Sequence, residues 1–348
     1  MVRYMKKINI YLIITIFLII LIFIEKEYPK PKKNTKEITW FLEDYVPLRN
    51  AGAEIVAHTF NKFLISKNYT VNVVGSWEDG MYDGVNYINE TNVEKVDSAV
   101  RKSYLLFSQL KYSKSTLELG KEKNKKVVLF IHDLFLREAI VEYKNIIGRS
   151  NLLIVFNSIS MKNNYINDIN YYILNPPVDC NKYITNTNKN YVTLINLNEN
   201  KGGNILIEIA KRMPDVEFLG VEGGYYSQII DKSVKNIIYI PHTSNIKEIY
   251  ANTDILLMPS KVETWGRTAS EAICSGIPVI AHPTEGIKEN LEEAGIYIER
   301  TKINEWVQTI RKLKTDKEYY KKQSERSKQH SKKRKENEME GLRKRMEA

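Results

Sequence analysis

Short apolar runs that alternate with helix-like segments constrain the fold of this chain more than any other feature. Runs at 38–42, 71–74 and 127–131 have the length and composition of buried strands. The segments 55–64 and 98–119 carry apolar residues at helical spacing and are expected to be helices. Parallel strands covered by helices on both faces produce this order. The sequence therefore predicts an α/β fold built from doubly wound parallel sheets.

The alternating pattern stops and starts again near the middle of the chain. Two adjacent prolines at Pro176 and Pro177 precede a polar stretch over 181–190, and a new apolar run begins at Tyr191. A chain of 348 residues is long enough for two domains. We expect two Rossmann-like domains, the first over 38–185 and the second over 186–313.

The amino-terminal segment predicts a membrane anchor. Ile8 to Ile24 contains no charged residue and would form a helix of about 25 Å, close to the thickness of a hydrocarbon core. A cleaved signal peptide is the alternative, but no pair of small residues follows the segment. The prediction is a single-pass anchor over 1–24 and a charged linker over 25–37. Basic residues on both sides leave the orientation in the membrane open.

The excess of positive charge is concentrated at the carboxyl end. The formal net charge is +10, and residues 311–348 hold 15 Lys and Arg against 7 Asp and Glu. This distribution predicts a basic tail over 314–348 and excludes a nucleic-acid-binding face spread over the fold. Cys180 and Cys274 are the two cysteines, and their spacing fits neither a disulfide-rich scaffold nor a zinc site. No metal site is expected.

Three loops follow predicted strands, where parallel sheets bind ligands. In the first loop, Lys201 and Gly202 stand just before a helix whose free amides suit an anion. In the second loop, Glu263 and Glu271 flank a glycine turn, and carboxylates can accept hydrogen bonds from sugar or ribose hydroxyls. The third loop places Gly52 at a helix start. Together the loops indicate a site for a polyol attached to a phosphate.

The same residues resemble a known family. Glu263 and Glu271, with Trp265 and Gly266 between them, resemble the E-x7-E signature of family 4 glycosyltransferases. The segments 51–54 and 200–202 resemble that family's Gly-Gly-Ala-Glu loop and its Lys-Gly turn, and the likeness runs from about 38 to 312.

The resemblance implies the GT-B fold, in which two Rossmann-like domains face each other across a cleft. The first domain would hold the acceptor, and the second the nucleotide-sugar donor. A helix over 304–313 would cross back to the first domain. The sugar would be transferred with retention of its anomeric configuration, without a cofactor and without a metal, and the chain shows no D-x-D motif suited to one.

The resemblance also implies residue roles. Glu271 would bind the ribose hydroxyls, Glu263 would lie beside the donor sugar, and Lys201 would neutralise the leaving diphosphate. His132 would reach the donor sugar from the first domain, and Gly52 would offer its amide to the phosphate. The remaining predicted donor-binding residues lie in the same loops and are Asn196, Asn198, Gly202, Trp265, Gly266, Arg267 and Thr268.

One position departs from the pattern. Asn196 stands where many relatives carry an arginine that shares the diphosphate charge, and an amide supplies a hydrogen bond but no charge. Either Asn198, Arg267 or Arg49 compensates, or the leaving group is less well stabilised.

The sequence thus predicts a membrane-anchored glycosyltransferase that moves a sugar from a nucleotide-sugar to an acceptor hydroxyl. The acceptor, whether glycan, lipid-linked sugar or protein, is left open. The alternatives are a catalytically inactive nucleotide- or sugar-binding module of the same fold and a sugar-nucleotide epimerase. A nicotinamide dehydrogenase is disfavoured because no G-x-G-x-x-G follows a strand.

Overall fold

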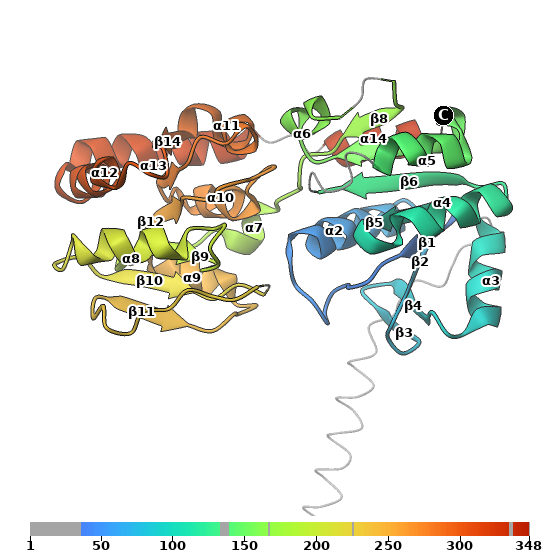
Figure 1. Cartoon of the computed structure of the whole chain (residues 1–348), viewed down its shortest axis with the longest axis horizontal. Coiled ribbons are helices and arrows are strands. Elements are labelled where there is room, and N and C mark those ends of the chain that lie inside the picture. The colour runs from blue at the N-terminus through green and yellow to red at the C-terminus, as the bar shows by residue number, and fades with distance from the viewer. Residues whose placement is uncertain (1–35, 133–138, 166–167, 225, 334–336, 348) are drawn as a thin grey trace, which may run out of the picture.

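The computed structural model describes residues 36–132, 139–165, 168–224, 226–333 and 337–347. Figure 1 shows two α/β domains side by side, each with a central sheet between layers of helices. The strand order is β3-β4-β2-β1-β5-β6-β7-β8 in the eight-stranded sheet of the first domain. It is β11-β10-β9-β12-β13-β14 in the six-stranded sheet of the second domain. Within both sheets the paired strands are parallel, except that β3 runs antiparallel to β4.

The elements of the first domain alternate between strands and helices. They are β1 (Lys36–Phe41), α2 (Gly52–Ser66), β2 (Tyr69–Gly75), β3 (Gly80–Tyr82), β4 (Val85–Asn89), α3 (Val93–Lys102), β5 (Ser103–Gln109), η1 (Leu110–Tyr112), α4 (Ser113–Glu122), β6 (Lys126–Ile131), α5 (Ala139–Ile147), η2 (Arg149–Asn151), β7 (Leu152–Phe156), α6 (Ile159–Asn163) and β8 (Tyr171–Ile173).

The second domain repeats this alternation. Its elements are α7 (Cys180–Tyr183), β9 (Tyr191–Ile195), α8 (Gly203–Lys211), β10 (Phe218–Val221), β11 (Ile237–Ile240), α9 (Ile246–Asn252), β12 (Thr253–Met258), α10 (Arg267–Ala272), η3 (Ile273–Ser275), β13 (Val279–Ala281), α11 (Glu285–Leu291), η4 (Glu292–Ala294), β14 (Gly295–Tyr297), α12 (Ile303–Thr315) and α13 (Lys317–Lys332).

Apolar faces on both sides of each sheet explain the layered architecture. In the first domain, Trp40 on β1 stacks on Phe107 of β5, with ring centroids 4.7 Å apart, and also contacts Phe130 of β6 at 5.0 Å. In the second domain, Phe218 of β10 and Trp306 of α12 are fully buried in one core. The prediction of two doubly wound domains is confirmed.

One expected helix is wrong. The segment 98–119, expected to be helical, contains the end of α3, all of β5, and most of α4. Strand β5 lies inside the sheet between β1 and β6, and both of its faces are buried, with Leu105 and Phe107 in one apolar core and Leu106 in another, so its apolar run is nearly continuous. A short continuous run of this kind does not by itself distinguish a strand from a buried helix.

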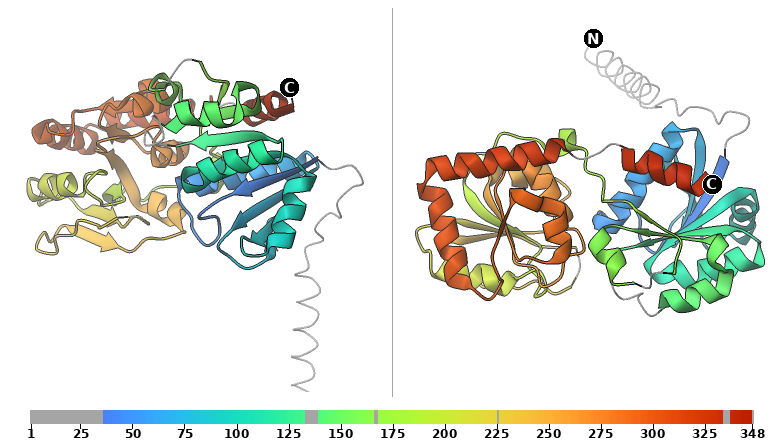
Figure 2. Two further views of the ribbon diagram at one scale, coloured as in Figure 1. Left: turned by 45° about the vertical axis from the view of Figure 1, so that its right-hand side comes forward. Right: turned by 90° about the horizontal axis from the view of Figure 1, so that it is seen from above.

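The carboxyl-terminal residues form helices that pack on both domains. Residues 314–348 were expected to be a basic tail, either a solvated or frayed helix or a segment attracted to anionic lipid headgroups, and most of them lie in α13 and in α14 (Asn337–Glu347). Helix α13 packs on the second domain, where the Tyr320 hydroxyl donates to the carbonyl of Asp254 at 3.1 Å. Helix α14 returns to the first domain and buries Leu342 and Met346 in its core. Figure 2 shows α14 lying on the first domain, close to its sheet.

The expected crossover helix is therefore placed differently. Residues 304–313 lie within α12, whose Trp306 and Ile310 are fully buried in the second domain. Helix α14 makes the return to the first domain instead. The sequence hid this because α13 and α14 are rich in Lys, Arg and Glu, and only a few residues on one face of each are buried.

The predicted membrane location is corrected as well. In the part of the chain that the structure describes, no helix is long and apolar enough to span a bilayer. The segment 8–24, on which the single-pass anchor was predicted, lies outside the described residues, as does most of the predicted linker.

Candidate functional site

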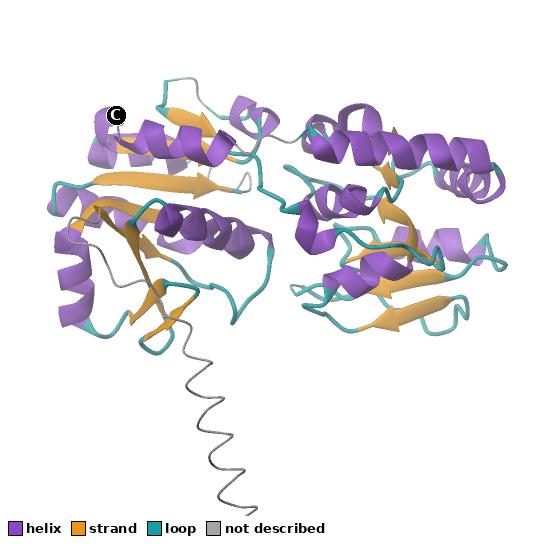
Figure 3. Cartoon of the chain, turned by 180° about the vertical axis from the view of Figure 1, so that it is seen from behind, coloured by secondary structure: helices purple, strands orange, loops and turns teal. Residues whose placement is uncertain are grey.

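A cavity of about 730 Å³ lies between the two domains. It is lined by loops that follow the carboxyl ends of β1, β6 and β7 in the first domain and of β9, β10, β11 and β12 in the second. Parallel sheets bind ligands at this edge, and here two such edges face each other. Figure 3 shows the two domains from behind, with the strands of each sheet directed across the interface.

The first domain contributes Gly52 and His132. Gly52 is the first residue of α2, and no atom lies within 4 Å of the position where a Cβ would stand, so its surroundings are open. His132 follows β6, and its Nε2 lies 2.9 Å from Oε1 of Gln109. Because a carbonyl oxygen only accepts, Nε2 carries the proton and Nδ1 is left as an acceptor. Burial lowers the pKa of His132 to about 4, so the ring is neutral at pH 7.

The loop after β9 turns sharply into α8. Asn196 has a φ of +73° and Gly202 a φ of +93°, which places both in the left-handed region. Asn198 is 6% exposed, and its Oδ1 accepts from the amide of Lys201 at 2.9 Å. Asn198 therefore shapes the turn, and the turn presents the Lys201 side chain to the cavity.

Lys201 meets Glu263 inside the cavity. Its Nζ forms an ion pair with the Glu263 carboxylate, which also accepts from the Ser260 hydroxyl at 2.9 Å. The Lys201 ammonium, which was expected to bind the diphosphate, is thus paired with the Glu263 carboxylate, which was expected to bind the sugar. A bound donor would have to share or replace this pair.

Asn290 supports the glycine turn after Glu263. Its Nδ2 donates to the carbonyls of Trp265 and Gly266 at 2.7 and 2.9 Å. Gly266 precedes α10 with a φ of +82°, and a Cβ there would lie 2.2 Å from a methyl of Ile287. The turn therefore requires glycine. The residues of the turn at the start of α10 line the cavity.

Glu271 is held by two neighbours. It is 5% exposed, its Oε1 lies 2.7 Å from Nε of Arg267, and its Oε2 accepts from the Tyr250 hydroxyl at 2.9 Å. The same guanidinium donates to the carbonyl of Pro177 at 2.9 Å and to the Tyr183 hydroxyl at 3.0 Å. Arg267 therefore ties the chain between the domains to the helix that carries Glu271.

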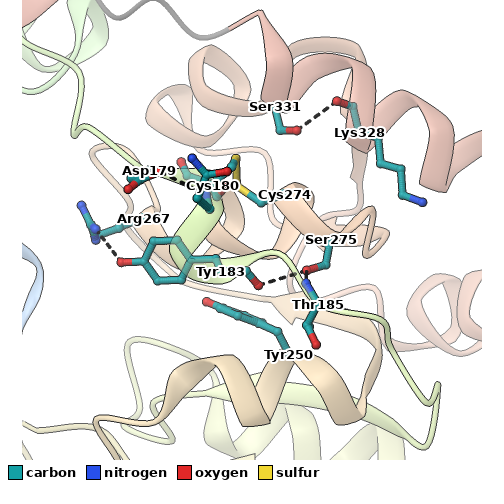
Figure 4. Close-up of a disulfide and its surroundings, with 12 residues drawn as sticks. Asp179, Cys180, Tyr183, Thr185, Tyr250, Arg267, Cys274, Ser275, Lys328 and Ser331 are labelled. Carbon is teal, nitrogen blue, oxygen red and sulfur yellow. Dashed lines mark hydrogen bonds between the residues drawn. A yellow bond between two sulfur atoms is a disulfide. The ribbon is translucent and has the colours of Figure 1, made fainter.

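A disulfide reinforces this attachment. Cys180 of α7 is bonded to Cys274 of η3, with an S–S distance of 2.01 Å and a Cα–Cα distance of 5.3 Å. Figure 4 shows the disulfide beside the ring of Tyr183, which points towards Arg267. Helix α7 also contacts α9 and α10 of the second domain.

Two sets of contacts join the domains around the cavity. The Thr264 hydroxyl donates to the carbonyl of His132 at 2.9 Å and accepts from Nδ2 of Asn157 at 2.8 Å. The Glu289 carboxylate of α11 accepts from the amides of Ile159 and Ser160 at the start of α6, at 2.8 Å each. These bonds hold the closed arrangement that completes the cavity.

Comparisons with known proteins agree with this architecture. Residues 181–330 match the sequence model of the family described as glycosyl transferases group 1. A Haemophilus influenzae protein named an uncharacterized glycosyltransferase is 27% identical over 160 residues, which cover 42% of this chain. The match spans 45% of that relative's length.

Solved structures extend the likeness to both domains. The Anabaena protein HepE, in complex with UDP and glucose, superposes with a TM-score of 0.72 at 16% identity, covering 90% of this chain and 100% of HepE. WaaG, a glycosyltransferase involved in lipopolysaccharide biosynthesis, gives a TM-score of 0.65 at 15% identity, covering 88% of this chain and 98% of WaaG.

The chain has the GT-B fold.

Most of the predicted site residues line the GT-B cavity. The residues that do so are Gly52, His132, Asn196, Lys201, Glu263, Trp265, Gly266, Arg267, Thr268 and Glu271. Asn198 and Gly202 lie behind the cavity surface in the β9–α8 turn, where they shape the loop. Arg49 pairs with Asp44 at 2.6 Å.

The sequence missed cavity residues that come from the chain between the two domains and from the interdomain contacts. They are Asn157, Pro176, Lys182, Tyr183 and Thr264. Thr264 lies in the loop that the sequence marked with Glu263 and Glu271, but it was not singled out there, and the other four residues lie outside the three marked loops. The Pro-Pro step was the one available signal, and it was interpreted as a connection only.

Proposed function

We propose that this chain is a glycosyltransferase that moves a sugar from a nucleotide-sugar to an acceptor hydroxyl with retention of anomeric configuration. The observation that supports the proposal best is the convergence of Lys201, Glu263, Glu271 and the amides before α10 in one cavity between two GT-B domains. The structures of HepE with UDP and with UDP-glucose make a uridine diphosphate sugar the first donor to test.

The proposed mechanism follows from the charge that develops in the reaction. Breaking the anomeric bond leaves negative charge on the diphosphate and positive charge on the sugar. Lys201 and the amides of Gly52 and the 265–268 turn line the cavity and would stabilise the diphosphate. Glu263, once released from Lys201, would accept hydrogen bonds from the donor sugar.

His132 has a distinct role in the proposal. Because its ring is neutral and Nε2 is bonded to Gln109, Nδ1 can accept a hydrogen bond from a sugar hydroxyl. Glu271 would bind the ribose through lone pairs that Arg267 and Tyr250 leave unused. The proposed reaction uses no resident cofactor or metal. Closure of the two domains would keep water away from the donor.

The test is an assay of donor turnover. Purified protein is incubated with a panel of nucleotide-sugars, UDP-glucose among them, and release of the nucleoside diphosphate is measured with and without candidate acceptors. Lys201→Ala should lower kcat by a factor that corresponds to about 2.7–4 kcal/mol. Lys211→Ala is the matched control, because Lys211 is exposed and pairs with Asp231 outside the cavity.

The outcomes separate the parts of the proposal. Turnover that Lys201→Ala leaves at the level of the control would refute the assigned site. Product of inverted configuration, detected by the anomeric proton coupling in NMR, would refute retention alone.

An inactive binding module is the second candidate. The Lys201–Glu263 ion pair favours it, because the two groups offset each other's charge. This alternative predicts that a nucleoside diphosphate binds in calorimetry while no donor turns over.

A further inference from the structure

Lys182 is a cation of the cavity that neither the sequence motifs nor the proposed mechanism assigns. It lies in α7, between the two domains, and lines the cavity. Four cationic side chains line this cavity: Lys182, Lys201, Lys247 and Arg267. Lys201 is paired with Glu263, and Arg267 is buried and bonded to Glu271, Tyr183 and Pro177. Among the described residues, Lys182 and Lys247 have no ion-pair partner.

The backbone around Lys182 is fastened to the second domain on both sides. The disulfide to Cys274 holds Cys180, two residues before the lysine. One residue after it, Tyr183 accepts from Arg267 through its hydroxyl and from the Ser275 hydroxyl, at 3.2 Å, through its carbonyl. Figure 4 shows how closely these bonds surround α7. The base of the Lys182 side chain is therefore fixed relative to α10, and only the flexible stem can move.

The charge of Lys182 acts across the interface on the first domain. Burial lowers the pKa of His58 in α2, Asp83 opposes that shift, and the positive charges of Lys62 and Lys182 reinforce it. Helix α2 is the helix whose first residue, Gly52, faces the cavity. Lys182 lines the same cavity as this first turn of α2, in which the proposed diphosphate would lie.

The charge balance of the cavity leaves a role for such a cation. The four cations face three lining carboxylates, Glu222, Glu263 and Glu271, which leaves a net charge of 4 − 3 = +1. The diphosphate of a nucleoside diphosphate sugar carries two negative charges. Lys201 is already shared with Glu263, and Asn196 at the end of β9 adds no charge. Lys182 is already counted in this net charge of +1, so without it the lining charges would sum to zero and would offset none of the charge on the ligand.

We propose that Lys182 is a second diphosphate-binding residue, positioned by the Cys180–Cys274 disulfide. It approaches the phosphate oxygens from α7, while Lys201 approaches them from the β9–α8 loop. The inference rests on the proposed function, because it requires a nucleoside diphosphate in this cavity.

The test measures binding of UDP and of uridine to the full chain by isothermal titration calorimetry. Lys182→Gln should weaken UDP binding roughly tenfold, the effect expected when one charge-assisted hydrogen bond is lost, and should leave uridine binding unchanged. Lys182→Arg should retain most of the affinity. Lys247→Gln is the matched control, because it removes the same charge from another unpaired lysine of the cavity, and it should change UDP affinity less than about threefold.

The outcomes are separable from those of the proposed function. If the wild-type chain binds none of UDP, GDP and ADP, the proposed function fails together with the inference. If the wild-type chain binds UDP but Lys182→Gln binds it equally well, the inference alone is overturned. Equal weakening by Lys182→Gln and Lys247→Gln would also overturn it, because the effect would then come from the overall field of the cavity.

A second measurement tests the positioning by the disulfide. The variant Cys180→Ser/Cys274→Ser, shown to be folded by circular dichroism, should bind UDP more weakly than the wild type. Adding Lys182→Gln in that background should then cost clearly less than tenfold, because α7 no longer holds the lysine in place. An undiminished cost of Lys182→Gln would refute the positioning role.

Discussion

The substitution Arg267→Met tests how the second domain holds Glu271. Methionine approximates the length of the arginine stem but removes the guanidinium, which lies 2.7 Å from Glu271 and donates to Pro177 and Tyr183 at 2.9 and 3.0 Å. Glu271 is 5% exposed, so its carboxylate would stay buried with only the Tyr250 hydroxyl as a partner.

The expected cost is large because one member of a buried pair is removed. Removing one partner of such a pair costs about 3–5 kcal/mol. For a domain of this size, that corresponds to a fall in Tm of roughly 6–20 °C. Urea unfolding, followed by tryptophan fluorescence, measures the free energy of unfolding directly, and Trp265 and Trp306 report on this domain.

A second substitution identifies the cause. An unpaired buried carboxylate destabilises the fold through its charge. Adding Glu271→Gln should recover most of the lost stability at pH 8.

Two results would refute this reasoning. The first is a loss below about 1 kcal/mol at pH 8, which would mean that water reaches the carboxylate and that the pair is not buried in solution. The second is a double variant that is less stable than Arg267→Met at pH 8, because the charge on Glu271 would then not be the cause.

Three further predictions concern the interface, the glycine turn and the buried histidine. Thr264→Val leaves the two polar groups that it bridges unpaired, at a cost of about 1–3 kcal/mol to the closed arrangement. Small-angle scattering should show a larger radius of gyration, and an unchanged radius would contradict the prediction. Gly266→Ala should lower Tm, because the positive φ of this position alone costs an alanine about 1–2 kcal/mol. Gly52→Ala should leave Tm unchanged, because the space around Gly52 is open. Equal Tm values for the two variants would contradict the prediction. His132 has a pKa of about 4 in the folded chain against 6.5 for the free side chain, so its contribution is fully present above pH 6.5. Up to roughly 3 kcal/mol of stability is lost as the pH falls from there towards 4, and His132→Gln should flatten this part of the profile in urea titrations at pH 7 and 4.5.

The sequence singled out several residues that line the cavity, and local chemistry marks each of them. Gly266 was interpreted from the sequence as the glycine of a tight turn. In the structure its positive φ and its close approach to Ile287 require glycine at this position. Lys201 and Glu263 were singled out because a lysine and an acid follow strand ends, and both line the cavity. These signals are local, because each depends on the residue itself and on the turn around it.

Several residues that the sequence singled out or missed already have partners in the structure. Asn198 looked like a ligand donor, but its side chain is used by the turn that it belongs to. Arg267 was one of the residues expected to supply charge to the diphosphate, and it is instead bonded to Glu271 and to the chain between the domains. Lys182 carries no motif at all. Which polar groups are already satisfied is decided by their neighbours in space, which a sequence does not show.

The amino-acid sequence by itself determined the architecture: buried strand runs at regular intervals and helical faces between them leave two doubly wound sheets as the way to bury the apolar side chains. Only the tertiary structure decided that the charged carboxyl-terminal helices pack on the two domains and that α14 returns to the first domain. It also decided that Cys180 meets Cys274 across 94 residues of sequence. Hydrophobic periodicity is a local property of the chain, whereas these docking and pairing choices depend on shape and partners that exist only after the two sheets have formed.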